Sequence, residues 1–220
     1  MKSGATNLHR SWLNLPHVTQ FDDADVTELE IFRKSLKPEA ERAGAKLTPL
    51  PFLMKVAAAA LREFPRVAGS FAADGEHYVL KKYCHVGFAV DTPDGLLVTV
   101  VRDVDRKGVF ELAEEIGELS ERARTKKLKP GDMQGGCFSI SSLGAIGGRG
   151  FTPIVNAPEV AILGVSRLAK QPVWNGSEFV PRDMLPLCLS YDHKAINGAE
   201  AGRFLTWYAQ ALGDVRRLLL

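Results

Sequence analysis

The chain lacks the cysteine pattern of a disulfide-rich or zinc-binding protein. Its three cysteines, Cys84, Cys137 and Cys188, lie far apart and give no CxxC or Cys/His ligand spacing. An odd number of cysteines without such a framework is typical of a reducing compartment. The sequence therefore predicts a cytoplasmic protein that holds no metal.

Long apolar runs and an excess of one charge are also missing. The most apolar segment, residues 54–61, is far shorter than the roughly 18 residues that cross a bilayer, and residues 1–10 are too polar for a secretory signal. The net charge is only +2, although basic residues cluster from Arg122 to Lys129. We interpret this cluster as a solvated helix end, with an anion or partner patch as the alternative. Membrane and nucleic-acid partners are therefore not expected.

The order of the helix and strand patterns predicts one α/β domain, residues 1–220, with a mixed β-sheet flanked by helices. Residues 1–15 are predicted to be an extended N-terminal arm closed by Pro16. Asp22 or Asp23 is the expected cap of the next helix, and Thr48 that of the helix after it. The TPDG turn at residues 92–95 predicts a hairpin. The expected helices are 23–36, 48–64, 109–125 and 198–212, and the expected strands are 78–83, 85–91, 96–101, 137–141, 160–166 and 185–190.

The most informative segment is LPLCLSYDHKAINGAE, residues 185–200, in which a buried strand leads directly into His193. The pattern places the imidazole on a short turn before a helix N-terminus, where the helix dipole disfavours imidazolium. This suits a fixed neutral base, and the alternative is a core histidine bonded to a backbone carbonyl. Asn197 is expected to cap the following helix, and the cap would also fix the turn that carries His193.

A serine-rich strand precedes a glycine-rich loop in GGCFSISSLG and the residues after it. Ser139, Ser141 and Ser142 could serve chemistry or could be ordinary surface and turn residues. No GxSxG elbow is present, so a hydrolase triad is disfavoured. The glycines between Gly144 and Gly150 fit no nucleotide-binding pattern, and tight backbone turns explain them better.

Five blocks in this order resemble the catalytic domain of the dihydrolipoamide acyltransferases, the E2 components of 2-oxo acid dehydrogenase complexes. They are residues 15–34, 61–71, 135–144, 151–166 and 185–204. The pattern is most similar to the acetyl-specific type from bacterial pyruvate dehydrogenase complexes. The resemblance implies the two-layer sandwich of chloramphenicol acetyltransferase, assembled as a homotrimer and then as a larger cubic core. It also implies an active-site channel between neighbouring subunits.

The resemblance further implies roles for individual residues. His193 would be the general base that deprotonates a thiol, and Ser141 of the adjacent subunit would bond the oxyanion. Coenzyme A and lipoamide would be the substrates, although no residue can be assigned to coenzyme A. The family's usual DHRxxDG reads DHKxxNG here, with Lys194 for Arg and Asn197 for Asp. If that Asp balances a buried cation, Arg10 is a candidate; if it only caps or hydrogen bonds, Asn197 can replace it.

Further partners follow from the same resemblance. They are the E1 and E3 components of the complex and lipoyl domains, because the lipoyl group would be carried on a separate domain absent from this chain. Leu218 to Leu220 would be buried in a contact between trimers. Two alternatives remain open, a weak or inactive scaffold subunit of the same fold and an acyltransferase that acts on a free small molecule.

Overall fold

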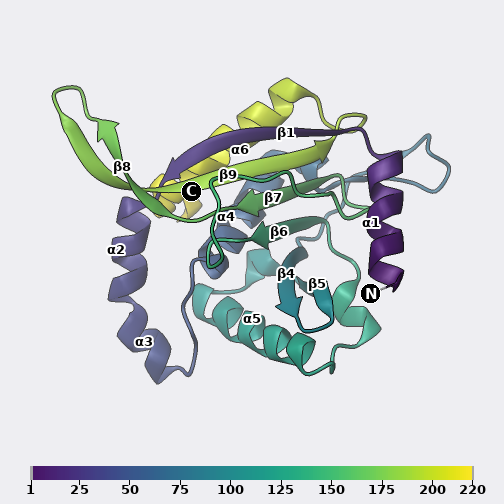
Figure 1. Cartoon of the computed structure of the whole chain (residues 1–220), viewed down its shortest axis with the longest axis horizontal. Helices are drawn as coiled ribbons and strands as arrows, with labels where there is room; N and C mark the ends of the chain where they lie inside the picture. Colours follow the sequence, from purple (N-terminus) through teal and green to yellow (C-terminus); the bar gives the residue numbers. More distant parts are fainter. Residues whose placement is uncertain (1, 220) are drawn as a thin grey trace.

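One mixed seven-stranded β-sheet organises the chain (Figure 1). Its strands lie in the order β1–β9–β7–β6–β4–β5, and β8 pairs with the first half of β9. The computed structural model describes residues 2–219, and it describes side chains from residue 6 to residue 217. Strand β6 runs parallel to β4 and β7, while the remaining pairs are antiparallel. The strands of this sheet are β1 (His17–Asp25), β4 (Val86–Thr92), β5 (Gly95–Val101), β6 (Phe138–Ser142), β7 (Ala161–Val165), β8 (Ala169–Trp174) and β9 (Phe179–Asp192).

A helical layer packs against this sheet. Helix α6 lies along β1 and β9, α5 lies along β4 and β5, and α4 contacts both helices. The predicted two-layer α/β sandwich with a mixed sheet is therefore confirmed. A separate hairpin consists of β2 (Ser70–Phe71) and β3 (Tyr78–Val79). The helices are α1 (Lys2–Asn14), α2 (Thr27–Ser35), α3 (Lys37–Arg42), α4 (Leu50–Glu63), α5 (Val109–Arg124) and α6 (Gly198–Gly213), with short 3-10 turns η1 (Pro65–Ala68), η2 (Val104–Arg106), η3 (Pro130–Met133) and η4 (Val215–Leu219).

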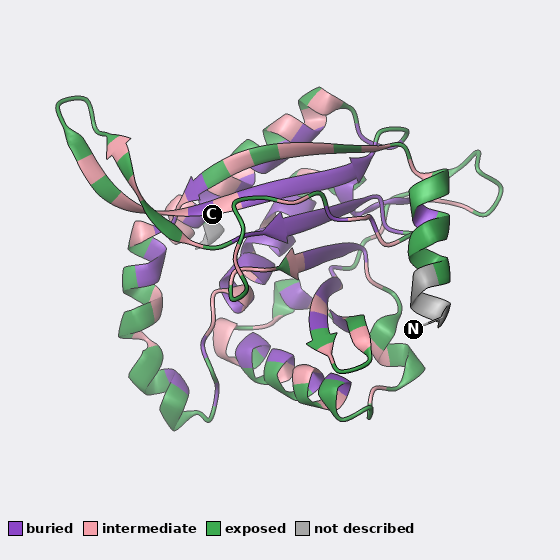
Figure 2. Ribbon diagram, viewed as in Figure 1, coloured by how far each residue is buried: buried purple, intermediate pink, exposed green. Residues whose placement is uncertain are grey.

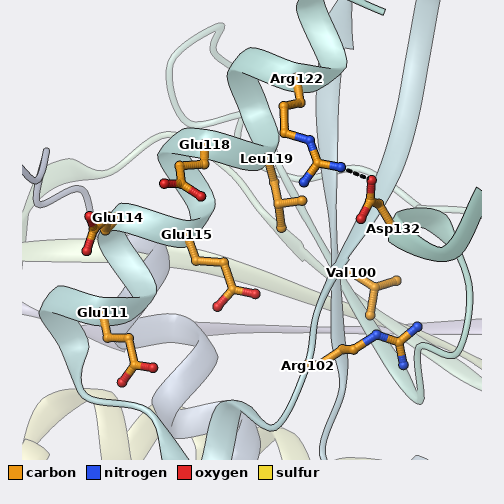
Figure 3. Close-up of a pocket in the computed structure, with 9 residues that line it drawn as sticks. All are labelled: Val100, Arg102, Glu111, Glu114, Glu115, Glu118, Leu119, Arg122 and Asp132. Atoms are coloured by element: carbon orange, nitrogen blue, oxygen red, sulfur yellow. Dashed lines mark hydrogen bonds and ion pairs between the residues drawn. The ribbon is translucent and has the colours of Figure 1, made fainter. Parts of the chain in front are cut away.

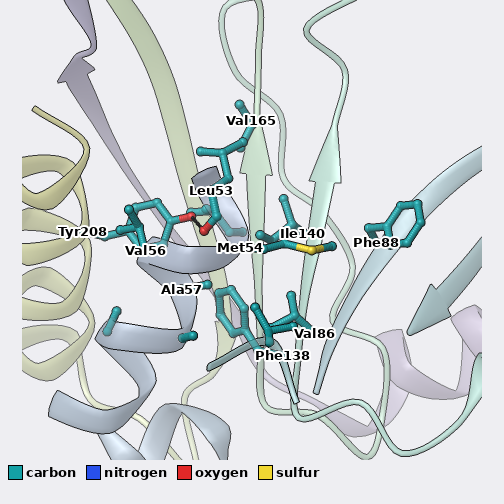
Figure 4. Packing of buried hydrophobic residues seen from close by; sticks show 14 of the residues in the cluster. Leu53, Met54, Val56, Ala57, Val86, Phe88, Phe138, Ile140, Val165 and Tyr208 are labelled. Atoms are coloured by element: carbon teal, nitrogen blue, oxygen red, sulfur yellow. Dashed lines mark hydrogen bonds between the residues drawn. The ribbon is translucent and has the colours of Figure 1, made fainter. Parts of the chain in front are cut away.

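The core lies between the sheet and the helical layer (Figures 2 and 4). Small residues such as Ala57 bring α4 close to its neighbours, and Phe138 of β6 packs on Phe204 of α6 with ring centroids 5.8 Å apart. The buried hydroxyl of Tyr208 donates a hydrogen bond of 2.6 Å to the carbonyl of Leu53. This bond ties α6 to α4, and α6 begins directly after the turn that carries His193.

The strongest local signals are confirmed. Strands β4 and β5 form the predicted hairpin, in which Thr92 pairs with Gly95 and Gly95 has a φ of 117°. The helix predicted at residues 109–125 is α5. The helix predicted at residues 198–212 is α6, and the side chain of Asn197 caps it.

The prediction of an extended N-terminal arm was wrong, because residues 2–14 form helix α1. No proline interrupts this stretch, and Pro16 only restricts the residue before it, so the helix runs until Asn14. The helix leaves Trp12 and Leu13 exposed, while Ser11 is buried against the body. The expectation for Leu218 to Leu220 concerns side chains outside the described residues.

Two predicted helix caps were also wrong, and the sequence pattern does not predict the strands β1, β2 and β8. Asp22 and Asp23 lie within β1, and α2 begins at Thr27 without a side-chain cap. Helix α4 begins at Leu50 without a side-chain cap, so Thr48 does not fill that role. Pro172 and Pro181 disfavour strands in a sequence pattern. The β8–β9 hairpin accommodates them because it is a two-stranded ribbon that projects from the sheet, at the upper left of Figure 1.

Candidate active site

The end of β9 delivers His193 onto a tight turn, residues 192–197, which we call the His193 turn. Asp192 is fully buried, and its amide donates a hydrogen bond of 2.8 Å to the carbonyl of Val160. The next amide, that of His193, donates one of 3.0 Å to the carbonyl of Pro16. The turn closes when the amides of Ala195 and Ile196 both donate to the carbonyl of Asp192. Main-chain bonds thus hold this turn from two sides.

The imidazole of His193 itself is free for chemistry. The side chain is exposed in the single chain, its ring lies 5.9 Å from that of Tyr191, and it forms a hydrogen bond with no other described residue. Asn197 starts α6 as its N-cap, and its Oδ1 accepts a hydrogen bond of 2.9 Å from the amide of Glu200. The positive end of the α6 dipole therefore lies beside the turn, as the sequence pattern indicated.

Two cations hold the turn from the side. The Nη2 of Arg66 donates a hydrogen bond of 2.7 Å to the carbonyl of Ala195, and its Nε lies 3.5 Å from a carboxylate oxygen of Glu200. Lys194 donates from Nζ to the carbonyl of Asn14, at the end of α1, over 2.9 Å. Arg10 is exposed and forms no ion pair within the described residues. Arg66, which sequence reasoning missed, is therefore the arginine on this turn.

A pocket of about 250 Å³ opens beside the His193 turn. The end of α1, the β2–β3 hairpin and the segment before β7 surround it. Its lining includes Asn14, Leu15, Phe71, Glu159, Asp192 and Lys194. The residues on either side of His193, Asp192 and Lys194, belong to this lining.

Ser141 lies at the opposite end of the sheet from His193. It is half-buried near the end of β6, level with Gly164 and, through Gly164, with Cys188 of β9. His193 comes five residues after Cys188, which corresponds to roughly 17 Å along the strand and about 10 Å across two strand spacings. The arrows of β6 and β9 point in opposite directions in Figure 1. One copy of the chain does not bring Ser141 and His193 together.

A second serine of the same strand belongs to a buried polar cluster. Ser139 is 1% exposed and lies next to Glu159, which is 3% exposed. Burial raises the pKa of Glu159 to about 8, against the smaller opposing effects of Ser139 and of the Lys81 charge. Burial also lowers the pKa of Lys81, whose Nζ has no hydrogen-bond partner among the described residues. The sequence pattern did not single out Glu159 or Lys81.

A separate pocket of about 450 Å³ lies between α5 and β5 (Figure 3). Glutamates from α5, among them Glu111 and Glu118, line it together with Arg102. Arg122 pairs with Asp132 at one side. None of the candidate residues faces this pocket, and the described part of the chain holds no group of side chains suited to a metal ion. Within the basic cluster, Arg122 is thus paired with Asp132 and Lys126 with Asp94.

The matched family is that of the 2-oxoacid dehydrogenases acyltransferase (catalytic domain), and the match covers residues 2–220. This chain belongs to that family. The acetyltransferase component of the pyruvate dehydrogenase complex of Pseudomonas aeruginosa is 61% identical over the whole chain, which covers 40% of that protein. The corresponding component of Azotobacter vinelandii is also 61% identical, and the chain covers 34% of it. The chain thus spans well under half the length of these curated relatives.

Solved structures agree with this family assignment. The cubic core of a pyruvate dehydrogenase multienzyme complex matches with a TM-score of 0.99 at 61% identity, over 100% of this chain and 90% of that chain. The A. vinelandii dihydrolipoamide acetyltransferase matches equally well over the same shares. Chloramphenicol acetyltransferase matches with a TM-score of 0.56 at 13% identity over 95% of this chain and 92% of that chain, and so shares the fold. No helix among residues 2–219 of this family member has the length and apolarity needed to cross a membrane.

Proposed function

We propose that this acyltransferase domain moves acetyl groups between dihydrolipoamide and coenzyme A, as part of a pyruvate dehydrogenase complex. Two relatives named as the acetyltransferase component of a pyruvate dehydrogenase complex are each 61% identical to this chain over its whole length. His193 and Ser141 are both present, and a pocket opens beside the His193 turn. Both thiol substrates would need access to one imidazole, and an exposed His193 allows this.

The observation that carries the proposal is a shared spacing of three residues. Crystallographic and enzymatic investigations of the A. vinelandii enzyme concern a serine, a histidine and an asparagine in its catalytic mechanism. The serine precedes that histidine by 52 positions, and the asparagine follows it by four. Ser141, His193 and Asn197 have the same separations. Since that enzyme also has an asparagine at this spacing, Asn197 does not favour an inactive scaffold.

The chemistry follows from the character of these groups. A ring nitrogen of His193 takes the proton from the attacking thiol, and the thiolate adds to the carbonyl carbon of the thioester. The hydroxyl of Ser141 donates a hydrogen bond to the resulting oxyanion. Collapse breaks the bond to the departing sulfur, which recovers the proton from the imidazolium. General-base catalysis contributes about 10²–10⁴ in rate, and one oxyanion donor about 10²–10³.

The separation of Ser141 from His193 supports a site shared between copies. A hydrogen bond across some 20 Å is impossible, so the serine would come from a second copy of the chain. We therefore propose a homotrimer that assembles further into a cubic core, together with E1 and E3 components and lipoyl domains. Asn197 would act indirectly, because it caps α6 and thereby fixes the His193 turn.

The test is acetyl transfer from acetyl-coenzyme A to dihydrolipoamide. We expect fast transfer by the natural sequence, a loss of about 10²–10⁴ in His193→Ala, and a loss of about 10²–10³ in Ser141→Ala. His77→Ala is the matched control, because among the described side chains its exposed ring pairs only with Asp74 of its own hairpin. A natural sequence that forms a large core but transfers no acetyl group would refute the proposal in favour of a scaffold. A free trimer active on a small acceptor would favour the remaining alternative.

A further inference from the structure

The His193 turn depends on two separate segments of the chain. The residues that join α1 to β1 supply the carbonyl of Pro16, which accepts the amide of His193. The segment before β7 supplies the carbonyl of Val160, which accepts the amide of Asp192. If these two segments move relative to each other, the direction of the His193 side chain changes with them.

One side chain, that of His17, connects these two segments. Its Nδ1 lies 2.7 Å from the carbonyl of Leu15, and its Nε2 lies 3.0 Å from the amide of Val155. An amide can only donate, so Nε2 must be the unprotonated nitrogen and the proton sits on Nδ1. His17 is therefore a neutral bridge that donates to one segment and accepts from the other. Its ring also lies 5.4 Å from that of Trp12 in α1.

We propose that His17 is a positioning residue for His193, and this inference rests on the acetyl transfer proposed above. His17 is the first residue of β1 and pairs directly with Asp192, the residue before His193. Its ring bonds to the carbonyl of Leu15, next to Pro16, and to the amide of Val155, in the segment that ends at Val160. The bridge therefore fixes the distance between the carbonyls of Pro16 and Val160. Because these carbonyls accept the amides of His193 and Asp192, it also fixes the direction of the His193 imidazole.

Two other contacts near this bridge are weaker substitutes, one between α1 and the segment before β7 and one between the His193 turn and α1. The hydroxyl of Ser11 accepts the amide of Ala157 at 3.3 Å, which is long for a hydrogen bond. Lys194 reaches the carbonyl of Asn14 through a flexible side chain that is half exposed. Val155 is fully buried, so its amide would lose its partner without replacement if the ring were removed.

Three substitutions at residue 17 separate the bridge from a local role. In His17→Gln the side-chain oxygen can still accept the amide of Val155, whereas in His17→Asn the amide nitrogen can only replace the local bond to Leu15. His17→Ala removes both bonds. We expect the Ala and Asn variants to lower kcat about 10- to 100-fold with KM changed less than about 3-fold, and the Gln variant to stay within about 5-fold of the natural sequence.

The matched control is His85→Ala. His85 also accepts a main-chain amide with a ring nitrogen, that of Asp103 at 3.0 Å, but it does so at the start of β4. We expect this variant to keep its kcat. Hydrogen exchange measured on the assembled protein should show faster exchange of the His193 and Val155 amides in His17→Ala, and unchanged exchange there in His85→Ala.

Each outcome bears on the inference. The order Gln above Asn and Ala, with an intact core and faster exchange at His193, supports it. A higher kcat in His17→Asn than in His17→Gln, or full activity in His17→Ala, would overturn this inference. The proposed function would still stand if His193→Ala is inactive in the same assay. Dissociation of the core in all three variants would make His17 an assembly residue and would also overturn it. A natural sequence without acetyl transfer would overturn the proposed function first, and this inference with it.

Discussion

Two inactive variants, mixed in one assembly, should recover activity if the active site forms between copies. The perturbation is the combination of Ser141→Ala with His193→Ala in a single preparation. Within one copy the two residues are roughly 17 Å apart along the strand direction and about 10 Å apart across it. Neither side chain can cover that distance, so a productive pair needs the serine of one copy and the histidine of another.

The expected recovery follows from counting neighbours. In a random equal mixture, half of the copies retain His193 and half of the adjacent copies retain Ser141. About a quarter of the sites in a cyclic assembly then contain both residues. Each variant alone should keep at most about 1% of the activity. A site built within one copy would contain both residues in no copy of the mixture.

The assay is acetyl transfer by co-expressed variants that carry two different tags and are purified on both. Preparations of each variant alone, assembled in the same way, are the controls, and their combined activity is the baseline. Activity near a quarter of that of the natural sequence would support the shared site. Activity no greater than the baseline would show that Ser141 and His193 do not act across copies, and our reasoning from sheet register would be refuted.

The remaining predictions concern stability and assembly. Folding raises the pKa of Glu159 from 4.5 to about 8, so the folded state holds the extra proton and stability falls as pH rises through this window. Denaturation of Glu159→Gln should show a stability advantage that grows by roughly 3–5 kcal/mol between about pH 4 and pH 9, and a constant difference would contradict this. Asn197→Ala should cost about 1 kcal/mol through the lost cap, whereas Asn197→Asp should keep the cap and substantial acetyl transfer; a large loss of transfer would count against a capping role. Tyr208→Phe should cost about 1 kcal/mol in urea unfolding, because the bond to Leu53 is lost. Deleting Leu218 to Leu220 should release trimers in sedimentation, and a core of unchanged size would contradict that contact.

Signals confined to a few neighbouring residues predicted the structure well. The TPDG turn, the amphipathic pattern of α5 and the Asn197 cap each depend on residues close in the chain, and each is found as expected. The errors occurred where context outweighs such signals. The sequence pattern predicts an extended arm closed by Pro16 although a helix precedes that proline, and prolines disfavour the β8–β9 hairpin that the structure contains.

The candidate site shows the same division. His193 and Asn197 share one turn, so a strand followed by a capped helix was enough to locate both. Arg66 contacts Ala195 from 129 residues away, and His17 contacts Val155 from 138 residues away. No spacing in the sequence predicts such pairs, because the pairing of strands and the packing of helices bring these distant residues together.

The sequence by itself determined the residue types, the turn that presents His193 and the serine-bearing strand before the glycine-rich loop. These depend on local backbone preferences and on polar side chains that cap their own neighbours. Only the tertiary structure decided that Ser141 and His193 lie at opposite ends of one sheet and that Glu159 is buried. Strand order and burial are set by contacts between distant segments, since the core forms only when those segments pack together.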